Sequence, residues 1–458
     1  MAERTVRGVP VGKTAVRQGT SASRRTPTNI RLSEKKKNSP SDTGFSNDKR
    51  NSYRNARKVS GGEAALEGNP SLKRPAKVKE KIKNKKITWV RYGFDYPLFT
   101  IVLILLAFGL IMMFSASYAV AYSTKGDSLF YLKKQAGFAA VGLVVMLAAA
   151  NVDYHLFAKK LIVVVLSGVS LVLMGAVKVA GTIGNGAERW LQIGSITFQP
   201  SEVLKFAVIV LFAYMIDTRY KYLKDFKKGY IPFMIALGVS CFSLMVQPHL
   251  SGTIIVFAIG FAMMFVGGLN SKHLLITLLI MIPAVIGGVL LLRELGYDYF
   301  DARFLSFTNP EADIEKDTFQ TYQSLVTIGS GGLFGLGFGN SRQKYAYLPE
   351  ARNDFIFAII CEELGFVGAI LVILLFVILI WRGFYIAIKA RDKFGMMLAF
   401  GITFQMGLQA LLNIAVVTNS VPNTGIALPF FSYGGSALLM QLGEMGILLN
   451  VSRKAALK

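Results

Sequence analysis

The sequence predicts an all-α integral membrane protein with about ten transmembrane helices. Hydrophobic residues make up 53% of its 458 residues and charged residues 17%, whereas soluble domains average about a quarter charged. Mean hydropathy is +0.46. From residue 97 onward, apolar stretches of bilayer-spanning length, roughly 17–25 residues, alternate with short polar segments. Only two cysteines and three histidines are present, which excludes a disulfide-stapled secreted domain and argues against a zinc site.

The first 91 residues differ from the rest of the chain. They hold 24 Lys and Arg against 7 Asp and Glu, so they carry +17 of the total net charge of +24. Such a segment cannot bury enough apolar surface to offset the entropy of ordering, and we predict a disordered tail. A basic segment before a membrane span stays in the cytoplasm and is attracted to anionic lipid. We therefore expect anionic lipid, and no nucleic acid, as its partner.

Residues 92–452 are predicted to form a ten-span membrane domain, and 453–458 a short cytoplasmic C-terminus. The spans are expected at 97–118, 134–150, 160–179, 201–217, 230–247, 250–268, 273–292, 355–381, 395–417 and 427–450. In this arrangement the inner loops carry 15 Lys and Arg against 4 acids, and the outer loops 10 against 11. Because basic loops are retained in the cytoplasm, both termini are predicted to be cytoplasmic.

Residues 293–354 are predicted to form one large extracytoplasmic loop between the seventh and eighth spans. A loop of this length is usually functional or disordered. This one contains aromatic residues, mixed charges and a glycine cluster between Gly329 and Gly339, so we expect an ordered, partly re-entrant cap. The glycines do not follow a strand and no Gly-Lys-Ser/Thr follows them, which excludes a phosphate-binding loop. They indicate a tightly turned loop packed on helices.

Ionisable residues within or at the ends of spans are functional candidates by default, because they are costly in a membrane. Glu202 and Lys205 lie three residues apart, hence on one helical face, and could simply pair with each other. Asp354 opens the eighth span, where a helix-capping acid would also be expected. Glu362 and Glu363 lie deeper in that span, and one of them is expected to bond a neighbouring helix. Glu444 is interpreted as structural.

The best candidates for functional charged and amide residues gather at the outer leaflet in the ten-span arrangement. They are Arg189, Glu202, Lys205, Gln247, Arg352 and Asp354. Basic side chains there could hold phosphate oxygens, and a carboxylate beside them could accept a proton from an attacking hydroxyl. Such a cluster suits an amphiphilic substrate with an anionic head. Composition and spacing alone leave a transporter, a channel and an integral enzyme open.

Several motifs around these residues closely resemble the SEDS family (shape, elongation, division and sporulation), whose members include FtsW and RodA. The resemblance covers about 97–452. Its motifs are 186–190 (Gly-Ala-Glu-Arg-Trp), 199–202 (Gln-Pro-Ser-Glu) with Lys205, 348–350 (Leu-Pro-Glu) with 353–357 (Asn-Asp-Phe-Ile-Phe), 362–365 (Glu-Glu-Leu-Gly) and 428–436 (Leu-Pro-Phe-Phe-Ser-Tyr-Gly-Gly-Ser). The stretches 441–447 and 341–344 resemble division (FtsW) and sporulation members more than the elongation type.

The resemblance implies a peptidoglycan glycosyltransferase that joins lipid II disaccharides through β-1,4 bonds at the outer face of the cytoplasmic membrane, at the division septum. The family's essential acid maps onto Asp354, which we expect to be the catalytic base. Supporting or substrate-binding residues are expected at Arg189, Trp190, Gln199, Glu202, Lys205, Gln247, Glu350, Arg352, Asn353 and Ser432. Among these, the leaving pyrophosphate is expected to contact Arg189, Lys205 and Arg352. A divalent cation, Mg²⁺ or Mn²⁺, is a candidate cofactor, and no organic cofactor is expected.

The chain departs from the family pattern at two places. The family's Gln-Pro-Asp-Leu-Gly-Thr segment reads Gln-Pro-His-Leu-Ser-Gly-Thr at 247–253, so His249 replaces the acid and one residue is inserted. Asn353 replaces a common Thr before the key Asp. The acid of the family segment is thus absent here, whereas Asn353 is a milder change that keeps a polar side chain.

The resemblance also implies partners and alternatives. Expected partners are lipid II, a cognate class B penicillin-binding protein and other division proteins. A lipid II flippase is the first alternative; it needs polar groups at the midplane and on both faces, whereas the candidates here gather at one face, which favours the enzyme. A non-catalytic scaffold that activates the penicillin-binding protein is the second alternative.

Overall fold

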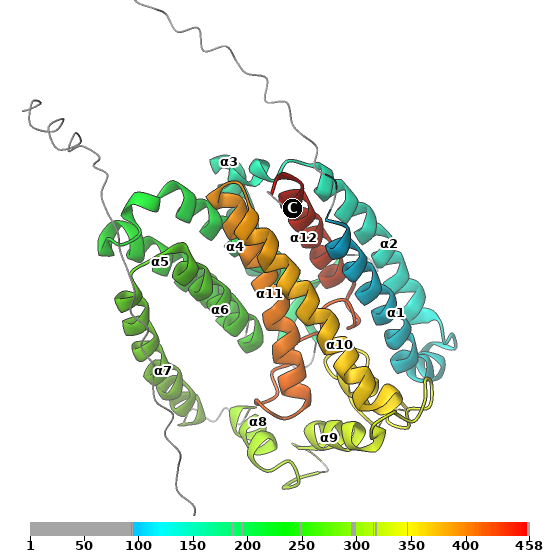
Figure 1. Ribbon diagram of the computed structural model, residues 1–458. Helices are drawn as coiled ribbons and strands as arrows, with labels where there is room; N and C mark the ends of the chain where they lie inside the picture. The colour runs from blue at the N-terminus through cyan, green and yellow to red at the C-terminus, as the bar shows by residue number, and fades with distance from the viewer. Residues whose placement is uncertain are drawn as a thin grey trace, which may run out of the picture. The chain divides into compact units, whose positions relative to one another are not determined.

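The structure is a computed structural model that describes residues 93, 95–184, 187–193, 196–247, 249–294, 299–314, 316, 318–345 and 347–455. The predicted basic tail at 1–91 and the last three residues lie outside the described residues. Helices dominate the described chain, as the predicted fold class requires (Figure 1).

A helix occupies each of the segments predicted to span a membrane. Their bounds are α1 Tyr96–Lys125, α2 Phe130–Asn151, α3 Lys160–Ala180, α4 Pro200–Thr218, α5 Ile231–Met245, α6 Leu250–Gly267, α7 Ser271–Glu294, α10 Ile356–Lys389, α11 Lys393–Val417 and α12 Gly435–Lys454. Within the described residues, seven segments are long and apolar enough to cross a membrane: α1, α2, α3, Phe226–Met245, α6, α10 and α11. The protein is therefore a largely helical, multi-pass membrane protein.

Smaller elements connect these helices. The single turns η1 (Tyr154–Ala158) and η2 (Tyr220–Tyr222) are 3-10 helical, and η3 (Phe226–Tyr230) is π-helical. The region between α7 and α10 contains two further helices, α8 (Tyr299–Thr308) and α9 (Phe319–Gly331). A three-stranded antiparallel sheet of β1 (Gly181–Gly184), β2 (Ala187–Ile193) and β3 (Ile196–Phe198) precedes α4. Neither the sheet nor the two helices were predicted from the sequence.

The start of the last predicted span is wrong by eight residues, because α12 begins at Gly435 and not at 427. Residues 427–434 are mostly apolar and 428–432 are buried, but the segment forms a folded loop instead of a helix. Phe430 has a positive φ of 66°, and the Leu428 amide donates to the Ser432 hydroxyl at 2.8 Å. An apolar composition predicts burial, and here the buried segment is a loop that borders a cavity.

Close packing of α2 against α12 depends on small residues at the interface, as is usual between membrane helices. A Cβ atom on Gly446 would lie 2.3 Å from the main-chain oxygen of Met146, and one on Gly142 would lie 2.5 Å from Leu442 Cδ1. In Figure 1, α12 lies beside α2, with α10 and α11 next to each other nearby. The C-terminal helix is thus held inside the bundle.

The long helix α10 is broken at Gly365, whose φ of 67° and ψ of −166° are not helical. The segment that follows α9 supplies hydrogen bonds to the main-chain groups that the break leaves without helical partners. Leu336 and Gly337 donate their amides to the oxygens of Glu362 and Glu363 at 2.9 and 3.0 Å. In return, the amides of Phe366 and Val367 donate to the oxygens of Gly332 and Leu333 at 2.9 and 3.1 Å.

The predicted glycine cluster makes this close contact between the segment and α10 possible. A Cβ atom on Gly331 would lie 1.9 Å from the oxygen of Cys361, and one on Gly335 would lie 2.2 Å from the oxygen of Glu363. The glycines therefore allow main chain to pack on main chain. This agrees with the predicted tightly turned loop on helices, and the contacts lie at Cys361 and Glu363 of α10, the helix that follows Asp354.

Candidate functional site

A polar cavity lies where β2, α4, the start of α6, the turn before α10 and the loop before α12 meet. It has about 150 Å³ open to water, which at ~10–15 Å³ for each molecule is room for roughly ten waters. Eight of the predicted site residues line it: Arg189, Trp190, Gln199, Glu202, Lys205, Asn353, Asp354 and Ser432. Residues that are far apart in the sequence thus share one water-accessible space.

The small sheet and the start of α4 bring in the first group of these residues. Arg189 and Trp190 lie on the central strand β2, where Trp190 pairs with Thr182 of β1. Strand β3 then leads through Gln199 into α4, which begins with Pro200, a residue well suited to a first helical turn. The Gln199 amide donates to the Ser436 hydroxyl at 3.3 Å, which fastens the sheet to α12.

Glu202 and Lys205 form a buried ion pair at the cavity wall. Their side chains meet at 2.7 Å, and the residues are only 7% and 3% exposed. The spacing of three residues on one helix places them together, as predicted. Because a buried charge is stable only when it is paired, Glu202 holds the ammonium group of Lys205 in place inside the cavity.

Asp354 lies in a tight turn directly before α10. The amides of Asn353 and Phe355 both donate to the oxygen of Glu350, at 2.9 and 3.3 Å. Glu350 itself has a positive φ of 53°, which is uncommon for a residue with a side chain. Asn413 Nδ2 donates to the main-chain oxygen of Asp354 at 2.7 Å. The position of Asp354 is therefore set by hydrogen bonds on both sides of it.

The surroundings of Asp354 raise the pKa of its carboxyl group from 3.8 to about 6. Burial is the main cause and the nearby Glu350 carboxylate adds to it, while Arg303 and Arg189 act in the opposite direction. A carboxyl group with a pKa close to neutral can accept a proton and release it again under cellular conditions. The residue thus has the properties of a general base.

His249 is a neutral member of the cavity wall. Burial, followed by the charges of Arg189 and Lys205, lowers the pKa of its imidazole to about 3. The Gly252 amide can only donate, and it lies 3.3 Å from Nδ1, so Nδ1 accepts and Nε2 carries the proton. Nε2 lies 3.2 Å from the Gln199 side-chain amide, which must therefore turn its oxygen toward the ring.

Three predicted residues are placed differently from the other eight. Gln247 is buried and its side-chain amide donates to the main-chain oxygen of Met174 at 2.5 Å, so it joins α3 to the end of α5. The Arg352 guanidinium lies 4.2 Å from the centre of the Tyr131 ring. Glu350 bonds the side-chain amide of Asn353. None of the three belongs to the cavity lining.

The prediction of a divalent cation can be compared with the available ligands. Among the described residues, no group of three or more His, Cys, Asp or Glu side chains is placed to hold a metal ion. Mg²⁺, however, is commonly bound by one or two carboxylates together with substrate phosphates. Of the carboxylates here, Asp354 lines the cavity, and Glu202 lines it but pairs with Lys205. Glu350 lies outside the lining and bonds Asn353, so such a cation would depend mainly on substrate oxygens.

Several lining residues were missed in the sequence. Gln409 of α11, Gln441 of α12 and Tyr433 of the preceding loop also face the cavity. Gln409 and Gln441 are polar residues within apolar segments, and this signal could have identified them. Tyr433 carries no comparable signal, because an aromatic residue in an apolar stretch is normally interpreted as packing.

The fold and this cavity define a class: a multi-pass, largely helical membrane protein whose polar cavity combines two basic residues with an aspartate of raised pKa. The chain matches the family model of cell cycle proteins that groups FtsW, RodA and SpoVE, over residues 96–457. It belongs to this family.

Individual relatives agree with the family match. A probable peptidoglycan glycosyltransferase FtsW of Geobacter sp. (strain M18) is 38% identical over 362 residues, which cover 79% of this chain and 97% of that protein. Stage V sporulation protein E of Bacillus subtilis (strain 168) is 41% identical, covering 78% of this chain and 97% of that protein.

Solved structures are similar as well. One, from work on the structural coordination of polymerization and crosslinking by a peptidoglycan synthase complex, has a TM-score of 0.66 and 26% identity. The rod shape determining protein RodA of Thermus thermophilus has a TM-score of 0.58 and 26% identity. Each comparison covers 80% of this chain and 99% of the other.

Proposed function

We propose that this protein is a peptidoglycan glycosyltransferase that joins lipid II disaccharides through β-1,4 bonds. One observation carries the proposal: Asp354, a carboxyl group with a raised pKa, lines the same cavity as the basic side chains of Arg189 and Lys205. A base and a phosphate-binding pair are the two components that this reaction requires. The activity is also the one named for the FtsW relative from Geobacter.

The acceptor is the 4-hydroxyl of N-acetylglucosamine on the incoming lipid II, and the donor is an α-linked glycan pyrophosphate. The acceptor oxygen attacks the anomeric carbon as the bond to pyrophosphate breaks, and one displacement inverts the α linkage to β. Asp354 accepts the proton of the hydroxyl. Its carboxylate is positioned for this step by the Asn413 hydrogen bond and by the turn at Glu350.

The leaving pyrophosphate gains negative charge during the reaction and needs fixed positive partners. Arg189 on β2 and Lys205 on α4 supply them from two sides of the cavity. Glu202 orients Lys205 through the 2.7 Å ion pair and does not react. Arg352, which lies over the Tyr131 ring, is assigned a supporting role in place of the predicted contact with pyrophosphate.

A divalent cation, Mg²⁺ or Mn²⁺, would be held mainly by oxygens of the substrate, because Asp354 serves as the base and Glu350, outside the cavity lining, bonds Asn353. Such a cation supplies charge neutralisation for the pyrophosphate group. The residues of the chain then hold the diphosphate and position the base, as described above.

The setting of the reaction is also part of the proposal. The ten helices at the predicted segments cross the membrane with both termini in the cytoplasm, so that the cavity faces the outer leaflet, where lipid II is polymerised. A class B penicillin-binding protein is the expected partner, since a structural neighbour belongs to a peptidoglycan synthase complex. The resemblance to FtsW favours a role at the division septum.

Purified protein, with and without its penicillin-binding partner, tests the proposal when it is supplied with lipid II and a divalent cation in detergent. Wild type is expected to form glycan chains that separate as a ladder on a gel. Asp354→Asn should lose them, while Asp127→Asn, which changes an exposed acid paired with Lys133, should not. A ladder of normal intensity from folded Asp354→Asn would remove Asp354 from the mechanism. No ladder from wild type with bound partner would favour a flippase or a scaffold.

One observation favours the flippase as a second candidate function. Polar side chains continue along α11 beyond the cavity, since Gln405, Gln409 and Asn413 are spaced four residues apart and are all buried. Gln405 donates to the Glu444 carboxylate of α12 at 2.9 Å. A flippase needs such groups near the midplane. The test measures transfer of fluorescent lipid II across vesicle membranes for wild type and Glu444→Gln. Because Glu444 does not line the cavity, a variant that loses transfer but still forms glycan would indicate a flippase.

A further inference from the structure

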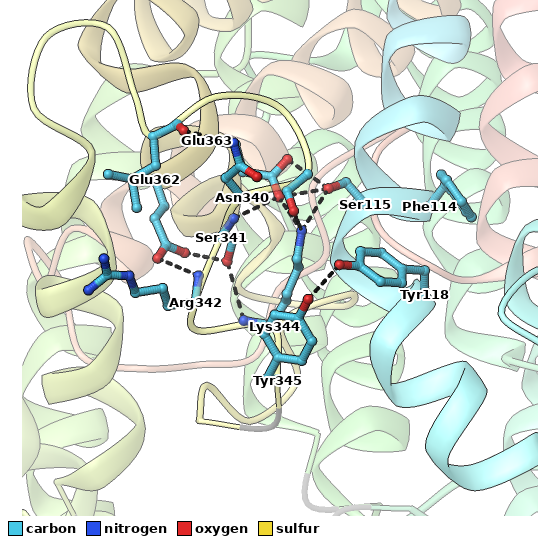
Figure 2. Close-up of polar contacts among 12 residues, drawn as sticks. Phe114, Ser115, Tyr118, Asn340, Ser341, Arg342, Lys344, Tyr345, Glu362 and Glu363 are labelled. Carbon is cyan, nitrogen blue, oxygen red and sulfur yellow. Dashed lines mark hydrogen bonds and ion pairs between the residues drawn. The ribbon is translucent and has the colours of Figure 1, made fainter.

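A second polar cluster lies outside the cavity, where the segment 336–345 meets α1 and α10 (Figure 2). Lys344 and Glu363 form its centre; both side chains are 0% exposed and they meet at 2.9 Å. The Ser115 hydroxyl of α1 lies 2.7 Å from both carboxylate oxygens of Glu363. The prediction that Glu362 or Glu363 bonds a neighbouring helix is therefore confirmed.

The ammonium group of Lys344 uses all three of its hydrogens. Besides Glu363, it donates to the main-chain oxygen of Gly339 at 2.5 Å and to the Ser115 hydroxyl at 3.5 Å. It also lies 4.7 Å from the centre of the Tyr118 ring. Every hydrogen of this buried cation thus has a partner, which is the condition for a stable buried charge.

Glu362 holds the same segment at a neighbouring point. Its carboxylate accepts a hydrogen bond from the Ser341 hydroxyl and another from the Arg342 amide at 2.9 Å. The Ser341 amide also donates to Glu363 at 3.4 Å. Two successive acids of α10 therefore bind Ser341, Arg342 and Lys344 of the loop, in addition to the main-chain bonds at the Gly365 break.

This fixed segment leads directly to Asp354, which follows Lys344 by ten residues. Among the described residues between them, the Leu348 amide donates to the oxygen of Gln343 at 3.1 Å, and the turn at Glu350 follows. Asp354 is then joined to α10, which carries Glu362 and Glu363. The loop with Asp354 is therefore held at both ends by α10.

A buried ion pair is a weak source of net stability. Apolar residues of similar size often stabilise a fold as well or better, whereas loss of one partner leaves a costly buried charge. Hydrogen bonds and ion pairs depend on direction, whereas apolar contacts do not. The pair can therefore hold Lys344 and Glu363 in one relative orientation, which apolar packing would not fix. This distinction separates a stabilising role from a positioning role.

We propose that Lys344 and Glu363 are positioning residues, which fix the loop 336–354 so that the Asp354 carboxylate stays at the reacting hydroxyl. This inference rests on the proposed function for its consequence in catalysis. A displacement of about 1 Å in a reacting group can lower a rate about 100-fold. The pair itself does not contact the substrate, because neither residue lines the cavity.

The chain offers a control in a second ion pair, which joins α10 to the start of α1. Asp95, at the start of α1, pairs with Arg382 of α10 at 2.8 Å. Arg382 follows Glu363 by 19 residues, so the two pairs lie roughly 28 Å apart along the helix. The double variants Lys344→Met/Glu363→Gln and Arg382→Met/Asp95→Asn each remove one pair without leaving a lone charge. In the second variant, the amide that replaces the Asp95 carboxylate can still cap α1.

The experiment measures thermal unfolding, kcat and KM for glycan formation, and hydrogen exchange of the full-length protein. Lys344→Met alone should lower Tm, and adding Glu363→Gln should restore most of it. The restored double variant should still show kcat about 100-fold below wild type with nearly unchanged KM. It should also show faster exchange at the amides of Leu348, Asn353 and Phe355. The Arg382/Asp95 double variant should keep wild-type kcat and exchange in this segment.

Wild-type kcat in a stable Lys344/Glu363 double variant would overturn the inference, and so would unchanged exchange at those three amides. The exchange readout does not depend on activity. If wild type formed no glycan at all, the proposed function would fail, while the hydrogen exchange would still decide whether the pair holds the loop.

Discussion

The side-chain amide of Asn413 donates a 2.7 Å hydrogen bond to the main-chain oxygen of Asp354, and a second, of 2.6 Å, to the oxygen of Ile426. One buried residue of α11 thus joins the turn before α10 to the loop before α12. These two segments carry Asp354 and Ser432 to the walls of the same cavity. Asn413 thus helps to fix the relative position of the two walls, together with the hydrogen bond that the Ser432 hydroxyl donates to the main-chain oxygen of Asn353 at 2.6 Å.

Replacing Asn413 should therefore affect both stability and rate. In Asn413→Leu, the buried oxygen of Ile426 and the partly buried oxygen of Asp354 lose their donor, which costs about 1–3 kcal/mol for a buried group left unpaired and less for the other. We expect a lower free energy of unfolding and a reduced kcat with a smaller change in KM. Urea unfolding in detergent and glycan assays measure the two effects. Asn413→Gln, which keeps the donor on a longer side chain, should retain more of both; equal losses in the two variants would contradict the role of the donor.

The raised pKa of Asp354 predicts a pH dependence of the rate. Because the proposed base must be deprotonated, kcat/KM should rise with pH, with a midpoint near the pKa of about 6. Arg189 lowers this pKa, so Arg189→Gln should move the midpoint to a higher pH. Rates measured between about pH 5 and pH 8.5 test this. A flat profile for wild type would show that Asp354 does not titrate in the rate-limiting step.

The same carboxyl group should influence stability in the opposite sense. Its folded pKa of about 6 exceeds the ordinary value of 3.8, so its contribution to folding is full below about pH 4 and is lost as the pH rises through 6. At pH 8, Asp354→Asn should be more stable than wild type by up to about 2–3 kcal/mol, and by less where water screens the charge. For Asp127, Lys133 holds the pKa below its usual range, so Asp127→Asn should gain nothing. Urea unfolding at pH 5 and pH 8 compares the three proteins.

Position 249 offers a test of charge in the cavity. His249→Asp would keep an N-cap for α6 and should fold, but it places a carboxylate beside Arg189 and Lys205. That carboxylate would compete with the pyrophosphate, so we expect a several-fold higher KM for lipid II at similar stability. His249→Asn, which is neutral and can also cap the helix, is the control. An unchanged KM in His249→Asp would show that the two cations are not substrate contacts.

Two glycines of α9 should respond differently to the same substitution. Gly331→Ala puts a methyl group 1.9 Å from the oxygen of Cys361, whereas a methyl group on Gly329 meets nothing within 4 Å. We expect Gly331→Ala to lower the free energy of unfolding by several kcal/mol, in the range of about 1–3 or more for overpacking. Gly329→Ala should be neutral or stabilise by about 0.5–1 kcal/mol. Thermal unfolding in detergent compares them, and similar Tm values would exclude a tight contact at Gly331.

The helices were largely predictable because a bilayer imposes a length and an apolar composition on each span. The pairing of Glu202 with Lys205 was predictable too, since a spacing of three on a helix determines it. The apolar loop at 427–434 was not, because hydropathy reports burial and not conformation. The three-stranded sheet also carries no strong alternation, and so β2, which holds Arg189, was expected to be a loop.

Contacts between distant segments were beyond sequence reasoning for a different reason. Gln247 and Gln199 were both predicted to be site residues, but the side chain of Gln247 bonds Met174 of α3. Lys344 was noticed only as part of a family-like stretch, although it is completely buried against Glu363. The direction of a side chain at the end of a helix depends on the conformation of the adjoining loop, and no local sequence pattern specifies that conformation.

The region 293–354 contains two parts that should tolerate engineering differently, because only one of them bonds the break in α10 at Gly365. Since residues 332–337 supply hydrogen bonds that α10 lacks, they are in effect a turn of that helix, and an epitope tag or deletion there would leave polar backbone unpaired at the edge of a bilayer. The turn at 309–312, by contrast, is largely exposed and ends α8. A fluorescent label placed there should follow the protein in living cells without disturbing it.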